Sequence, residues 1–181
     1  MAEEIHEKTI DTLDYAPDDP KDERNLEKPL KFLVVVDDTP EAEVALYYAG
    51  LRAHRTHGLL TLLRVIEPEK GFQHWASVAE TMRAEAFEDA EKLMRAHATQ
   101  VHKDSGLIPE IVIREGTTRD RVLELIEEDR DIRILVLAAS ADKDGPGPLV
   151  TALAGQMSGG LAIPITVVPG NLSHAQLERL A

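Results

Sequence analysis

Two adjacent carboxylates, Asp37 and Asp38, stand directly after a short apolar run of the sequence. Paired carboxylates are suitable ligands for a hard divalent cation. The same pattern is typical of residues that cap a turn, and here Thr39 and Pro40 lead into a predicted helix. The sequence leaves both interpretations open, and because capping is the expected one, no metal site is predicted.

Gly145 and Gly147 belong to a second segment that could bind a ligand, the loop at residues 138–148. Glycines permit positive φ and let backbone amides approach an anion closely, so this pair before a predicted helix is a candidate anion site. The chain has no cysteine, and its paired histidines lack a third zinc ligand nearby. No Ser/His/Asp arrangement is evident, so we expect a binding protein rather than an enzyme.

Short apolar runs that alternate with amphipathic segments must position these residues. The predicted strands are residues 30–36, 59–66, 111–113, 134–137 and 163–168. Helices are expected between them and again after Ser173, where Gln176 completes a capping-box pattern. Apolar strands that alternate with helices are typical of a parallel sheet covered on both faces. The sequence therefore predicts a doubly wound (Rossmann-like) α/β fold.

The expected fold brings the two candidate segments together. In an open doubly wound sheet, ligands bind at the carboxyl ends of the strands, where the winding direction reverses. If the first strand is central, this crevice lies between its end and the end of the fourth strand. Asp37, Asp38 and Thr39 follow the first strand, and the loop with Gly145 and Gly147 follows the fourth. We expect any ligand to lie between these two segments.

The composition excludes several classes of partner. A formal net charge of −13 disfavours nucleic acid and anionic membrane surfaces. No apolar run approaches the roughly 20 residues of a membrane helix, and no apolar signal core follows the acidic amino terminus. We expect a cytoplasmic protein with an acidic tail or arm at residues 1–29, a domain at 30–170 and a short helix at 171–181.

Several segments resemble the universal stress protein family, in the order in which that family carries them. Residues 34–41 are similar to its first strand and acidic turn, and residues 62–68 are similar to its second strand. Residues 114–116 resemble the end of its third strand, while 135–137 and 163–168 resemble the fourth and fifth. The resemblance implies a five-stranded parallel sheet in the order 3-2-1-4-5, with helices on both faces.

The resemblance also implies site residues and partners. Asp37 matches the acid that contacts adenine in the nucleotide-binding branch of the family, and Val65 matches an apolar neighbour of adenine. Gly116 and Ala138 stand at the ends of the third and fourth strands and complete the candidate site. The family further implies a homodimer that often uses the fifth strand, here 163–168, and protein partners of unknown identity.

The glycine-rich phosphate loop of the nucleotide-binding branch is missing. Its form is Gly-x2-Gly-x9-Gly followed by Ser or Thr, and its required positions fall on Ala138, Ala141, Thr151 and Ala152. Asp142 and Asp144 add negative charge where a triphosphate would lie. Each such carboxylate adds about 1 kcal/mol of repulsion even in a high dielectric. We therefore expect a branch of the family without this loop and disfavour ATP as a cofactor.

Two functions from different classes remain. The first is a dimeric binding or signalling protein of the stress response that does not bind ATP tightly. The second is a sensor of adenine nucleotides or another small ligand, with at most weak hydrolase activity. A phosphorylated receiver domain is rejected, because it needs an acceptor Asp after the third strand and a Lys after the fifth. This chain has Glu115 and Gly116 at the first place and Pro169 at the second.

Overall fold

Five parallel strands form one sheet in the computed structural model, which describes residues 28–68, 76–141, 145–156 and 161–181. The strands are Lys31–Val35 (β1), Leu59–Ile66 (β2), Glu110–Glu115 (β3), Ile132–Ala139 (β4) and Ile165–Pro169 (β5). Their order is β3-β2-β1-β4-β5, and every neighbouring pair is parallel. The predicted α/β fold and strand order are confirmed. Most of the predicted tail, residues 1–27, lies outside the described residues.

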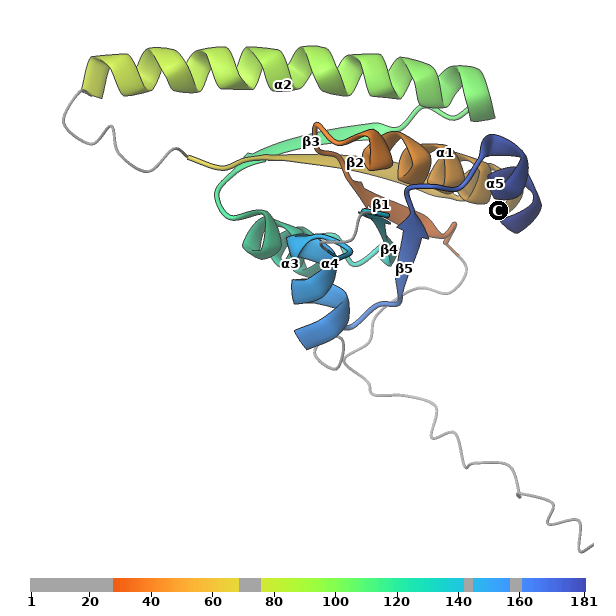
Figure 1. Ribbon diagram of the computed structural model, residues 1–181. Helices are drawn as coiled ribbons and strands as arrows, with labels where there is room; N and C mark the ends of the chain where they lie inside the picture. The colour runs from red at the N-terminus through yellow and green to blue at the C-terminus, as the bar shows by residue number, and fades with distance from the viewer. Residues whose placement is uncertain (1–27, 69–75, 142–144, 157–160) are drawn as a thin grey trace, which may run out of the picture.

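Helices cover both faces of the sheet (Figure 1). They are α1 (Pro40–Arg55), α2 (Ala76–Ser105), α3 (Thr118–Glu128), α4 (Pro148–Val150), the π-helical turn η1 (Thr151–Gln156) and α5 (His174–Leu180). One face carries α1, α2 and α5, and the other carries α3, α4 and η1. Among the described residues, no helix is both long enough and apolar enough to cross a membrane.

The central strand β1 contributes to both hydrophobic cores. Phe32 and Val34 pack with Met94 and other buried residues on the α1–α2 face. Leu33 and Val35 pack on the α3–α4 face. All four β1 side chains are at most 7% exposed. Alternate residues of a strand point to opposite faces, which explains why this strand is apolar at consecutive positions.

The fifth strand begins and ends later than predicted, which corrects the interval 163–168. Ile163 is only 6% exposed and packs in the core on the α3–α4 face, ahead of the strand. Pro164 has no amide hydrogen, so it cannot donate to the ladder, although its carbonyl accepts from Leu135 N at 3.0 Å. The strand proper is Ile165–Pro169. β3 and β4 also extend beyond the predicted 111–113 and 134–137.

Local signals in the sequence set two helix starts. Pro148 lies in the first turn of α4, where its missing amide hydrogen and fixed φ are tolerated. Ser173 and Gln176 form the predicted capping box of α5, with Ser173 N donating to Gln176 Oε1 at 2.9 Å. These short motifs act through neighbours in the chain, so they depend little on the rest of the fold.

Candidate functional site

Two cavities open at the carboxyl ends of the strands, where the strand order reverses between β1 and β4. The smaller has a volume of about 130 Å³ and lies beside the loop that contains Gly147. The larger, about 340 Å³, lies between the ends of β1 and β2 and the start of α3. The residues that line both cavities, and so form their boundary, are Val35, Asp37, Pro148 and Leu149.

The smaller cavity is lined by carboxylates and small residues. The predicted site residues that it brings together are Asp37, Thr39, Ala138 and Gly147. Glu41 joins them, and none of the described residues that line this cavity is basic. The side chain of Glu41 lies over Gly170, where an added Cβ would be 2.1 Å from Glu41 Cγ. The glycine therefore makes room for this carboxylate.

The larger cavity contains Val65, which the resemblance assigned to an apolar contact with a ligand. Val65 is 8% exposed and belongs to the core on the α3–α4 face. Arg64, Glu67 and Arg119 also line the cavity, so charges of both signs surround the apolar surface. Such a lining can hold a flat, polar ring on Val65 and hydrogen-bond its edge.

A carboxylate occupies the amino terminus of α3, at the rim of the larger cavity. Glu67 Oε1 accepts from the backbone N of Thr118 at 3.0 Å and from its hydroxyl at 2.7 Å. The N-cap residue Thr117 makes no side-chain capping bond of its own. The exposed amides at a helix amino terminus attract anions, and here Glu67 supplies the negative charge.

Asp37 and Asp38 are directed to different partners. Asp37 Oδ1 accepts from the backbone N of Thr39 at 3.0 Å and also from its hydroxyl. Asp38 Oδ2 pairs with Arg64 Nη2 at 2.6 Å and lines neither cavity. Within the described part of the chain, no three His, Asp or Glu side chains form a group that could hold a metal ion. Asp37 thus bonds within the turn before α1, whereas Asp38 connects this turn to β2.

The predicted glycines have positive φ, but only one lines a cavity. Gly116 has φ of 137°, Gly145 of 100° and Gly147 of 96°, conformations that side-chain-bearing residues rarely adopt. Gly147 is the N-cap of α4 and lines the smaller cavity. Gly116 and Gly145 line neither cavity. Gly116 N instead donates to Ile66 O at 3.0 Å, which extends the pairing of β2 and β3.

The remaining positions of the expected phosphate loop are dispersed. Thr151 lies in η1, and its hydroxyl donates to Gly147 O at 2.8 Å. Ala152 lines the larger cavity rather than the smaller one. Asp142 and Asp144 lie outside the described residues. This segment therefore does not present its predicted positions to a single cavity.

Sequence reasoning missed two carboxylates that the fold brings to the site, Glu41 and Glu67. Glu41 is the second residue of α1, and Glu67 directly follows β2. One signal could have indicated Glu67, because it stands at the carboxyl end of the strand next to β1. The same signal applies to Glu41, which follows the carboxyl end of β1, although its packing over Gly170 is a contact between residues distant in the sequence.

The fold is similar to those of several solved structures. Universal stress protein UspA from Lactobacillus plantarum has a TM-score of 0.66 at 19% identity, covering 78% of this chain and 98% of that one. A universal stress protein from Archaeoglobus fulgidus in complex with dAMP has a TM-score of 0.53 at 16% identity, covering 76% of this chain and 96% of that one. Another universal stress protein, in complex with cAMP, has a TM-score of 0.52 at 16% identity, covering 77% of this chain and 96% of that one. A search of curated proteins gave no match.

Structural likeness at these low identities establishes only a shared fold, so the family assignment rests on the sequence. The model of the Universal stress protein family matches residues 30–169, which extend from the residue before β1 to the end of β5. Both cavities at the carboxyl ends of the strands are lined entirely from this segment. The chain therefore belongs to the universal stress protein family.

Proposed function

We propose that this chain is a cytoplasmic, dimeric universal-stress-type protein that acts by binding partners rather than by catalysis, and that it does not bind ATP tightly. The observation that carries the proposal is that carboxylates line the cavity beside Gly147 and occupy the amino terminus of α3. Asp37 and Glu41 line the cavity beside Gly147, and Glu67 caps α3. The net charge of −13 favours partners other than nucleic acid.

The smaller cavity disfavours a triphosphate by charge and by size. Two like unit charges about 4 Å apart repel by roughly 1 kcal/mol in water, and by more in a partly buried crevice. Its volume of about 130 Å³ is below the roughly 300 Å³ at which small-molecule pockets begin. Since about 1.4 kcal/mol corresponds to a tenfold loss of affinity, repulsion from Asp37 and Glu41 weakens ATP binding substantially.

The amino terminus of α3 is the other natural place for an anion in this crevice. There Glu67 already accepts two hydrogen bonds from Thr118. An incoming phosphate must displace this carboxylate or lie beside it, and either outcome is unfavourable. A ligand with little negative charge avoids both.

A small-ligand sensor is the second candidate, and the larger cavity favours it. Its volume of about 340 Å³ falls within the range of ligand pockets. Val65 offers an apolar surface and Asp37 an acceptor, which suits a nucleoside base with an amino group. Two proteins of similar fold are described in complex with dAMP and cAMP, both of them monophosphates. Any hydrolysis would be a weak side activity.

The edge strand β5 supports the dimer. Leu135 N donates to Pro164 O at 3.0 Å, which sets the register of β5 against β4. Because inward and outward amides alternate along a strand, the amides of Ile165 and Val167 point away from β4. An open edge of this kind can pair with another strand. Pairing with the same strand of a second copy across a two-fold axis satisfies both edges at once.

Calorimetric titration with ATP and Mg²⁺ tests the proposal. We expect a dissociation constant weaker than about 100 μM for the unmodified protein. Glu41→Gln removes about 1 kcal/mol of repulsion and should raise ATP affinity about fivefold. Glu127→Gln makes the same change of net charge on the exposed surface of α3 and should leave the affinity unchanged.

Submicromolar ATP binding, or a purified sample that carries stoichiometric nucleotide, would contradict the proposal. The second candidate is tested in the same instrument with adenosine. Adenosine that binds more tightly than ATP supports the sensor, because it fills the larger cavity without bringing charge to Glu41 or Glu67. If neither compound binds, the crevice is not a site for adenine ligands.

A further inference from the structure

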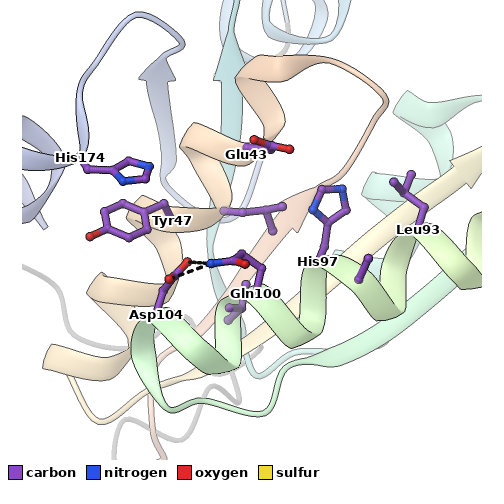
Figure 2. Close-up of a pocket in the computed structure, with 10 residues that line it drawn as sticks. Glu43, Tyr47, Leu93, His97, Gln100, Asp104 and His174 are labelled. Atoms are coloured by element: carbon purple, nitrogen blue, oxygen red, sulfur yellow. Dashed lines mark hydrogen bonds between the residues drawn. The ribbon is translucent and has the colours of Figure 1, made fainter.

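A third cavity, which Figure 2 shows in close-up, is lined by residues of α1, α2 and α5. Its volume is about 510 Å³, and it shares no lining residue with the two cavities at the carboxyl ends of the strands. One wall comes from His174 of α5, which lies beyond the segment 30–169 that the family model matches. This cavity is therefore built in part by a helix that follows the family domain.

The floor of the third cavity is apolar. Leu46 and Val101 are each 4% exposed, and Leu93 lines the side of the cavity. Tyr47 stacks on His174, with ring centroids 4.2 Å apart and planes inclined by 16°. This stack joins α1 to α5 beside the cavity, as Figure 2 shows.

Two carboxylates stand at separate places along this floor. Glu43 interacts electrostatically with His97, and Asp104 interacts with Tyr47. His97 and Asp104 are seven residues apart on α2, which corresponds to two helical turns or about 10 Å. In Figure 2, Glu43 lies toward His97, and Asp104 lies below Tyr47.

Both carboxylates keep capacity for a ligand. Gln100 Nε2 donates to both oxygens of Asp104 at 2.9 Å and so holds this side chain in place. Glu43 accepts no hydrogen bond from the described residues. A carboxylate offers about four lone-pair sites, so neither group is saturated.

Histidines are the only basic side chains among the described residues that line the cavity. The described residues that line the cavity include no lysine or arginine. Burial lowers the pKa of His97 in spite of the opposing effect of Glu43 and Asp38. The lowered pKa favours the uncharged form of His97 at pH 7, so this side chain does not offset the charges of Glu43 and Asp104.

We propose that this cavity binds a linear aliphatic diamine, with one ammonium group beside Glu43 and the other beside Asp104. The methylene chain lies on the apolar floor, where its burial is favourable. The two carboxylates line the cavity from different helices, Glu43 from α1 and Asp104 from α2. The amino-terminal segment 1–27 is a poorer occupant, because its acidic residues outnumber its basic ones.

Calorimetric titration of the full chain with 1,5-diaminopentane at low ionic strength tests this proposal. We expect one molecule to bind per chain. 1-Aminopentane and 1,5-pentanediol should bind more weakly, since they lack one or both charges. Glu43→Gln and Asp104→Asn should each weaken diamine binding about two- to fivefold, the range for partly exposed ion pairs.

Two control variants separate a built site from general attraction to an acidic protein. Glu127→Gln removes one charge from the exposed surface of α3 and should leave binding unchanged. Ala96→Phe adds volume at a lining position without changing charge and should abolish binding.

Three outcomes would overturn the proposal: no saturable binding, equal weakening by Glu127→Gln and Glu43→Gln, or wild-type binding by Ala96→Phe. Circular dichroism of each variant verifies that the helices are retained. The outcome of the diamine titration does not depend on whether the crevice beside Gly147 binds ATP, because the two sites share no residue.

Discussion

At the scale of single residues, close approaches between backbone segments decide what a position tolerates. A Cβ at Gly58 would lie 2.4 Å from Leu30 O. This approach exists because Leu59 N donates to Leu30 O at 2.8 Å, at the start of the pairing between β1 and β2. Gly170 is comparable at the candidate site, where it makes room for Glu41. In both places, glycine is required by a neighbour that is distant in the sequence.

Gly58→Ala is therefore expected to lower the free energy of unfolding by about 1–3 kcal/mol, the usual range for overpacking. The carbonyl of Leu30 belongs to the backbone and cannot move aside as a flexible side chain can. Urea unfolding followed by circular dichroism measures the change. Gly155→Ala in η1 is the control, because an added Cβ there meets nothing within 4 Å. An equal loss of stability in both variants would contradict the steric explanation.

At the scale of elements, Lys31 links β1 to the start of β3 and to the end of α3, at the amino-terminal ends of the strands. Its Nζ lies 2.6 Å from Glu110 Oε2, at the start of β3, and 2.5 Å from Asp129 Oδ2, just after α3. The lysine side chain is only 13% exposed. Burial alone would lower the pKa of Lys31, but the hydrogen bonds and charges of Asp129 and Glu110 outweigh it and raise the pKa. The ammonium group therefore stays charged at neutral pH.

Lys31→Met should lower the free energy of unfolding by about 1–2 kcal/mol, since both carboxylates lose a charged donor. Lys92→Met is a matched control, because Lys92 also pairs with two acids, Glu88 and Asp89, but on the exposed surface of α2. We expect the control to lose less stability than Lys31→Met in the same urea experiment, because water and salt screen an exposed ion pair. A similar loss in both variants would mean that burial does not distinguish these two ion-pair groups.

At the scale of the whole molecule, helices cover both faces of the sheet, and β3 and β5 form its two edges. The carboxyl-terminal helix α5 packs on α1, where Tyr47 contacts both His174 and Glu178. It thus adds to one face of the sheet. Val167, in the middle of β5, is 37% exposed. The proposed dimer depends on this edge strand.

We expect light scattering to report a dimer at micromolar concentration. Val167→Pro removes an amide that points away from β4, so it should shift the protein toward monomer while leaving the sheet intact. Val167→Thr keeps this amide and should remain dimeric. A monomeric unmodified protein would refute the dimer. A dimer that tolerates Val167→Pro would instead place the interface on another surface.

Much of the fold could be predicted from the sequence, because the responsible interactions leave local patterns. Burial on both faces makes β1 apolar at consecutive positions, and the capping box of Ser173 and Gln176 lies within one helical turn. The alternation of strands and helices then implies the parallel sheet and the place of the crevice. The late start of β5 was not predicted, because Ile163 is apolar and packs in the core although it lies ahead of the strand.

Only the tertiary structure decided which side chains meet. Asp37 and Asp38 are adjacent in the sequence, yet one binds Thr39 in its own turn and the other Arg64 of β2. The third cavity likewise depends on the stacking of Tyr47 with His174, two residues near opposite ends of the described chain. The contact of Asp37 with Thr39 belongs to a local capping pattern, but the contacts Asp38–Arg64 and Tyr47–His174 leave no periodic pattern or motif in the sequence. They form only when packing of the sheet and its helices brings distant residues within reach of one another.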